Sequence, residues 1–277
     1  MRPSWPKQAT HRAPQGGPRA HLDAARAIAH RRAMIPIRDH NPSLRTPYVT
    51  LTLIGVNIAV YLYSAAVLTT DQALLRFYYD YAMIPARLSG GENYSGLATA
   101  IFVHAGILHL AGNVLFLWIF GDNMEDKMGH IPFLVFYMVS GVGANLAQFA
   151  VDTGSPIPTV GASGAIAGVM GGYLLLFPKA KVDIFIFLIV FIRILPIPAW
   201  IMLGLWFGLQ VFNGLGADIN SGGVAYWAHA GGFVIGLGLT VPLWLRLGAG
   251  GWWQATDFHP PHPEARYPSS IPVVKRR

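Results

Sequence analysis

Long uncharged stretches dominate the chain between residue 49 and residue 245, and shorter segments that carry the charged residues separate them. Six of the stretches have roughly the 18 to 24 residues that an α-helix needs to cross a bilayer. They cover residues 49–68, 97–120, 131–151, 160–177, 194–212 and 224–245. The pattern predicts an all-α, polytopic membrane protein built on a bundle of six transmembrane helices.

The segment 184–192 is also apolar, but its roughly nine residues reach only about half of that length. Arg193 interrupts the apolar run, and Pro196 and Pro198 follow at the start of the fifth span. We therefore interpret 184–192 as an interfacial or re-entrant segment and not as a seventh span.

The basic residues predict the orientation of the bundle. Of the 20 Lys and Arg, 18 fall on the side of the membrane that holds both termini, while only Arg76 and Arg87 fall on the other side. Because positive loops stay in the cytoplasm, both termini should be cytoplasmic. The net charge of +7 then reflects orientation and contacts with anionic headgroups, and we expect no nucleic-acid partner.

Composition divides the chain into three parts. Residues 1–46 form a basic cytoplasmic tail that we expect to be largely disordered, residues 47–247 form the six-helix domain, and residues 248–277 form a cytoplasmic C-terminal tail. The first 33 residues lack the apolar core of a signal peptide, and Met34 is a candidate start of translation. Since no clear transit leader precedes Met34, a bacterial plasma membrane is the expected location.

The remaining composition narrows the possible chemistry. Only 12% of the residues are charged, against about 25% in soluble domains, and the chain has no cysteine for a disulfide or a thiolate. The His-Glu-x-x-His pattern is absent, and none of the six predicted spans contains Asp or Glu. We therefore expect no metal site and no cofactor.

Ser163 is the candidate nucleophile. It stands between Gly161 and Gly164, directly before an uncharged run, and glycines on both sides allow a tight turn that exposes a hydroxyl. At the start of a helix its amide is also free to donate to an oxyanion. The alternative is that Ser163 is only one of several small residues that let membrane helices pack closely.

His229 is the candidate general base, near the start of the sixth span. In the predicted topology the fourth and sixth spans run in the same direction, so Ser163 and His229 both lie toward their outer ends. Gly232 and Gly236 would let these spans pack closely. No carboxylate is placed to orient the ring, which predicts a two-residue dyad. The alternative is a histidine that only hydrogen-bonds to a neighbouring helix.

The second span contains further polar residues: His104, His109 and Asn113. His109 and Asn113 are four residues apart and share one helix face. An imidazole and a carboxamide side by side can donate hydrogen bonds to the oxyanion that forms when a hydroxyl attacks a carbonyl. Interhelical hydrogen bonding is the competing explanation.

In their order along the chain, from His104 through Ser163 to His229, these residues resemble the rhomboid family of intramembrane serine proteases. The resemblance covers most of residues 46–246. The resemblance implies a nucleophilic Ser163, a basic His229, an oxyanion hole at His109 and Asn113, and a structural His104. It also matches Glu125 to a charged position after the second span. The implied substrates are single-span membrane proteins, cut in or near the bilayer at small residues beside a helix-destabilising stretch.

Two departures from the family's pattern concern the surroundings of the site. Many members have an aromatic residue four positions after the serine that stacks on the histidine, where this chain has Ala167. The family's Trp-Arg pair in the first loop is also not evident.

Two alternatives to a protease stay open: a non-catalytic rhomboid-like protein that binds membrane clients, and a transporter that relays protons through the intramembrane histidines.

Overall fold

The computed structural model describes residues 33–40, 43–188, 191–216 and 223–261. Within them, five helices are long and apolar enough to cross a membrane: α2 (Tyr48–Val67), α6 (Ile107–Met128), α7 (His130–Val151), α9 (Ala199–Gly216) and α10 (Tyr226–Arg246). A sixth apolar helix, α8 (Ser163–Leu176), has 14 residues. The chain is a polytopic helical membrane protein, as the sequence predicted.

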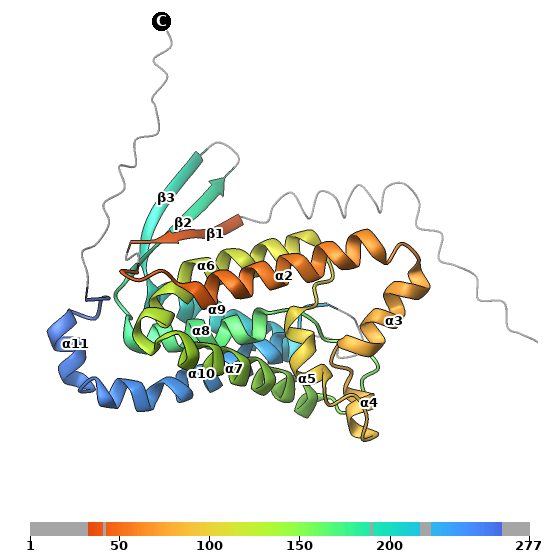
Figure 1. Cartoon of the computed structure of the whole chain (residues 1–277). Helices are drawn as coiled ribbons and strands as arrows, with labels where there is room; N and C mark the ends of the chain where they lie inside the picture. The colour runs from red at the N-terminus through yellow and green to blue at the C-terminus, as the bar shows by residue number, and fades with distance from the viewer. Residues whose placement is uncertain (1–32, 41–42, 189–190, 217–222, 262–277) are drawn as a thin grey trace, which may run out of the picture.

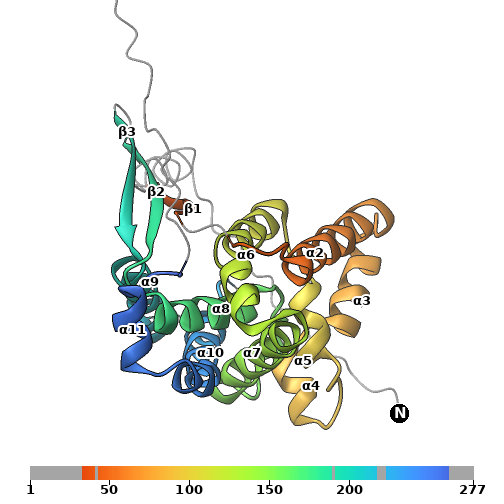
Figure 2. The same ribbon diagram turned by 60° about the vertical axis from the view of Figure 1, so that its left-hand side comes forward.

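Helix α8 occupies the centre of the bundle and contacts α6, α7, α9 and α10 (Figures 1 and 2). Eleven of its residues are buried, and 14 residues extend only about 21 Å. That is shorter than a hydrocarbon core of about 30 Å. The surrounding helices cover α8, so it does not have to match the bilayer thickness.

Helices α8 and α10 run in the same direction and approach closely where glycines of the two helices meet. A Cβ added to Gly232 would lie 2.1 Å from the carbonyl oxygen of Gly164, and one added to Gly236 would lie 2.2 Å from the carbonyl oxygen of Gly168. Only hydrogen side chains permit this approach. The two glycine pairs, each four residues apart on both helices, therefore fix the register between α8 and α10.

The predicted span 97–120 is not one continuous helix. Residues Gly96–Thr99 form the short helix α5, Ala100–Phe102 form a 3₁₀ turn, and residues 103–106 form a non-helical connection before α6 begins at Ile107. Gly106 caps α6 in an extended conformation, so His104 lies before the helix and not within it. At its other end α6 continues past Phe120 to Met128, with charged residues on its last turns.

Most of the segment 184–192 lies in a β-hairpin, which the sequence did not predict. Strands β2 (Lys181–Leu188) and β3 (Phe191–Pro198) form an antiparallel hairpin, and β1 (Ala33–Asp39) pairs with the other edge of β2. Isoleucine and phenylalanine favour strands, and an open sheet edge cannot be exposed to lipid. The sheet lies beside the helical bundle in Figure 1. Its interfacial placement stays a prediction.

The fifth predicted span also begins later than expected. Residues 194–198 belong to β3, and α9 begins at Ala199. Pro196 and Pro198 explain the difference, because the residue before a proline favours an extended backbone.

Both predicted tails contain regular structure. The first 32 residues of the N-terminal tail lie outside the described residues, but β1 belongs to the part that we expected to be disordered. In the C-terminal tail, α11 (Gly250–Thr256) packs at the C-terminal end of α8, where the indole N–H groups of Trp252 and Trp253 donate to the carbonyls of Leu176 and Leu175. These bonds satisfy carbonyl groups that the end of α8 leaves without intrahelical partners.

The long loop after α2 folds over one end of the bundle as α3 (Asp71–Tyr81) and α4 (Pro85–Ser89), followed by α5 (Figure 1). In this loop the Arg87 guanidinium lies 3.6 Å from the centre of the Tyr79 ring. Met83 and Thr159 exchange two backbone hydrogen bonds. The loop is thereby tied to the segment that leads into α8.

Candidate active site

Ser163 is the first residue of α8, and a glycine turn holds it there. Gly161 has φ +120°, which a residue with a side chain rarely adopts, and its N–H donates to the carbonyl of Ala100 at 2.9 Å. Because Ser163 begins the helix, its N–H belongs to the group of amides without an intrahelical acceptor. The turn thus presents a hydroxyl and a backbone donor at the same place.

The structure brings Ser163 and His229 together. Oγ of Ser163 lies 2.7 Å from Nε2 of His229, which is the distance of a short hydrogen bond. His229 is the fourth residue of α10, and the carboxamide of Gln148 on α7 accepts from the N–H of Ala228 at 3.1 Å. The glycine packing of α8 against α10 sets the register in which serine and imidazole meet.

Helix α9 supplies two further neighbours of the imidazole. Nδ1 of His229 lies 2.9 Å from Oε1 of Gln210, and the Trp206 ring lies 5.8 Å from the His229 ring, at 32° to it. Sequence reasoning left open what holds this ring in the absence of an aromatic residue at position 167. These two α9 residues occupy that role.

His109 borders the same small space as Ser163. A Cβ added to Gly161 would lie 2.6 Å from Nε2 of His109 and 3.6 Å from Oγ of Ser163. The buried ring of His104 meets His109 edge to face, at 5.2 Å between centroids. Asn113 is buried one turn further along α6, and its Nδ2 donates to the backbone carbonyl of His109 at 3.1 Å. The roles of these three residues in an oxyanion hole stay predictions.

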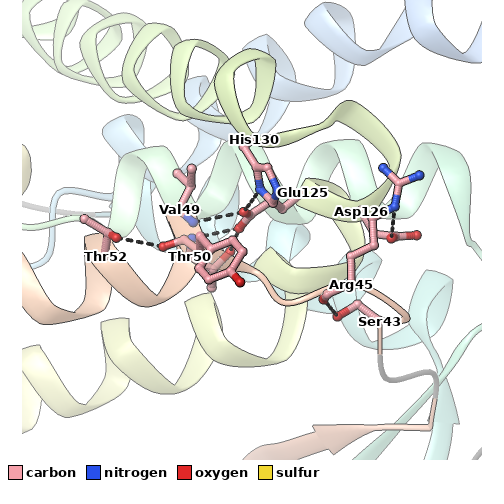
Figure 3. Close-up of polar contacts among 9 residues, drawn as sticks. Ser43, Arg45, Val49, Thr50, Thr52, Glu125, Asp126 and His130 are labelled. Carbon is pink, nitrogen blue, oxygen red and sulfur yellow. Dashed lines mark hydrogen bonds and ion pairs between the residues drawn. The ribbon is translucent and has the colours of Figure 1, made fainter.

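A separate polar centre lies at the far end of α6, around Glu125 (Figure 3). Its buried carboxylate accepts from the N–H groups of Val49 and Thr50 at 2.9 and 2.8 Å, and from the Thr50 hydroxyl at 2.7 Å. Nδ1 of His130 lies 2.6 Å from the same carboxylate. Glu125 therefore caps the N-terminus of α2, where a negative charge is favoured. The same carboxylate joins α2 to α6 and α7.

Sequence reasoning missed Gln210 and Trp206, although a signal existed for the first. A polar side chain inside an uncharged span is a functional candidate by default, and Gln210 fits that description as well as Asn113 does. Trp206 carries no such signal, because an aromatic residue in an apolar helix usually packs against lipid or core. In the part of the chain that the structure describes, no cluster of three His, Cys, Asp or Glu residues is arranged to hold a metal ion.

The sequence model described as "Rhomboid domain" matches residues 91–246. The chain is 32% identical over 146 residues to the yeast "Rhomboid protein 1, mitochondrial", a segment that covers 49% of this chain and 38% of the yeast protein. It is 44% identical over 78 residues to "Rhomboid protease GluP" of Bacillus subtilis, which covers 28% of this chain and 15% of that protein.

A third similar protein is "Rhomboid-like protein 11, chloroplastic" of Arabidopsis thaliana, with 42% identity over 71 residues, or 26% of this chain and 25% of that protein. The chain thus spans less than half the length of each of these relatives. Two of the three names place the relative in an organelle, so the expectation of a bacterial plasma membrane receives no support from them.

Proposed function

The chain belongs to the rhomboid family, and from this premise we propose that it is an intramembrane serine endopeptidase that cleaves single-span membrane proteins. The hydrogen bond of 2.7 Å between Ser163 Oγ and His229 Nε2 carries the proposal. A nucleophile and a base within hydrogen-bond reach, with the base oriented by a third group, are the requirements of nucleophilic catalysis. The similarity to a relative named as a protease adds support.

In the first step, Nε2 of His229 takes the hydroxyl proton of Ser163 as Oγ attacks the scissile carbonyl carbon. The carbonyl oxygen becomes an oxyanion. The N–H of Ser163 at the start of α8 is one donor available to it, and His109 and Asn113 are the proposed side-chain donors. The imidazolium of His229 then gives its proton to the leaving amine, the peptide bond breaks, and an acyl ester remains on Ser163.

Water completes the cycle. His229 takes a proton from a water molecule, whose oxygen attacks the ester carbonyl, and the same proton returns to Ser163 when the ester bond breaks. Water must therefore reach Ser163. Ser163 lies at the N-terminal end of α8, directly after the loop segment of residues 152–162. This position is compatible with a site that opens toward one surface of the membrane.

The substrate class follows from the location of the site. The hydrogen bonds of a transmembrane helix occupy its carbonyl groups, so a bound segment must unwind locally before Ser163 can attack. Substrates with helix-destabilising residues near the cut should therefore be favoured. The charge distribution supports an orientation in which both termini share the positively charged side of the membrane.

Cleavage by purified protein tests the proposal. The wild type, Ser163→Ala and His229→Ala are reconstituted in liposomes with a panel of single-span proteins that carry helix-destabilising residues. The wild type should cleave at least one substrate, and both variants should lose essentially all cleavage while they keep the wild-type unfolding temperature. Cleavage that persists in either variant would remove that residue from the mechanism. A wild type that binds the panel without cleaving any member would favour the client-binding alternative.

A further inference from the structure

Gln210 is a buried polar side chain in the middle of the apolar helix α9. Its carboxamide makes two contacts: Nε2 donates to the backbone carbonyl of Trp206, one turn earlier, at 3.3 Å, and Oε1 lies 2.9 Å from Nδ1 of His229. Burying a carboxamide in an apolar helix costs free energy unless both of its ends are bonded. The two contacts meet that requirement.

The two bonds of Gln210 have a defined direction. A backbone carbonyl can only accept, so the NH₂ end of the carboxamide faces Trp206 and the oxygen faces His229. An amide oxygen can also only accept, so Nδ1 of His229 must carry a hydrogen. The neutral ring then has its lone pair on Nε2, the nitrogen that faces the hydroxyl of Ser163. The Trp206 carbonyl thus determines, through Gln210, which nitrogen of His229 can act as the base.

Trp206 contributes through its ring as well. Its side chain packs against His229 at 5.8 Å and against Phe233, one turn later on α10, at 6.2 Å. Trp206 and Gln210 are four residues apart and so lie on one face of α9. This face presents an aromatic surface and a hydrogen-bond acceptor to the imidazole of His229. Together the two contacts restrict rotation of the His229 side chain.

We propose that Gln210 is a positioning residue that holds His229 in the tautomer that can accept the proton of Ser163. The inference rests on the proposed function for its catalytic consequence, but the tautomer itself is a property of the resting protein. In hydrolases with a Ser-His-Asp triad a carboxylate does this work and also stabilises the imidazolium. The neutral carboxamide of Gln210 supplies the orientation without the charge, in a span that contains no acidic residue.

Two substitutions separate the hydrogen bond from the packing. Gln210→Met keeps nearly the same shape but has no acceptor for Nδ1. Gln210→Glu keeps an acceptor in either protonation state, and when protonated it reproduces both bonds of the carboxamide. Leu209→Ala, at the neighbouring and exposed position of α9, is the control for a change in the same helix. We expect Gln210→Met to lower kcat about 10- to 100-fold and to change KM less than about twofold. Gln210→Glu should recover most of that loss, and Leu209→Ala should resemble the wild type.

Nitrogen-15 NMR of protein with labelled histidines gives a readout that does not depend on turnover. The His229 signals are assigned by their loss in His229→Ala. The wild type should show a protonated Nδ1 and an unprotonated Nε2, and Gln210→Met should show a mixture of both tautomers. A wild-type spectrum with the hydrogen on Nε2 would overturn the inference, as would equal kcat losses in Gln210→Met and Gln210→Glu. If the wild type cleaves nothing but has the expected tautomer, the proposed function fails and the structural role of Gln210 stands.

Discussion

Gly161 determines how Ser163 is presented. Its φ of +120° and its close approach to the His109 ring leave no room for a side chain. We predict that Gly161→Ala lowers kcat/KM for substrate cleavage at least about tenfold. The variant relieves the strain by shifting the turn that carries Ser163, and a misplacement of about 1 Å in a reacting group can lower the rate about 100-fold. Gly112→Ala is the control, since a Cβ on Gly112 meets nothing within 4 Å. Equal activity of both variants would show that the turn is not critical.

The sequence predicted a site at Ser163, His229, His109 and Asn113, because polar groups inside a membrane span are rare and these four stand at helix starts or on one helix face. The structure brings the first three around one small space. It shows Asn113 bonded to the backbone of its own helix. Gln210 could have been found by the same rule. Its contact with His229 could not have been found in this way, because the contact depends on the orientation of α9 relative to α10.

The contact between α8 and α10 depends on a close approach of the two backbones. We predict that Gly236→Ala lowers the unfolding temperature and abolishes most cleavage, because its Cβ would lie 2.2 Å from the Gly168 carbonyl oxygen and must push the helices apart. Overpacking of this kind costs about 1–3 kcal/mol. Gly238→Ala on the same helix meets nothing within 4 Å and should leave both quantities unchanged. Thermal unfolding in detergent and the cleavage assay measure the two effects.

Glu125 joins α2 to α6 and α7, so its removal should affect stability and not the reaction. Glu125→Gln weakens hydrogen bonds to two backbone N–H groups and to His130. We expect the free energy of unfolding to fall by about 1.5–3 kcal/mol, the range for a hydrogen bond to a charged group. Glu92→Gln removes an exposed carboxylate that lies 3.3 Å from Arg87 and should change stability by less than about 1 kcal/mol. Similar losses in the two variants would contradict the capping role.

The sequence predicted the helical elements better than their ends and missed the strands. Apolar length identifies a membrane helix, but it cannot locate the break at Gly106, where an apolar run continues through a turn. The hairpin β2–β3 was missed because a short apolar run fits a strand and a re-entrant segment equally well. Its pairing with β1 involves residues about 150 positions apart. No local pattern contains that information.

The absence of cysteine from the sequence allows a clean test of the membrane topology of the whole molecule. Leu44→Cys and Tyr94→Cys each introduce one exposed thiol, the first before α2 and the second in the long loop after it. A membrane-impermeant maleimide added to intact cells should label Tyr94→Cys. It should label Leu44→Cys only after the membrane is permeabilised. Labelling of both variants from the same side would contradict the predicted orientation.

The proposed mechanism depends on a serine hydroxyl that its neighbours make nucleophilic inside a membrane protein. A fluorophosphonate, which reacts covalently with activated serines, tests this directly when the modified residue is identified by mass spectrometry. We predict an adduct on Ser163 in the wild type, its absence in Ser163→Ala, and a loss of at least about 100-fold in labelling rate in His229→Ala. Labelling of Ser163 at the wild-type rate in His229→Ala would contradict it.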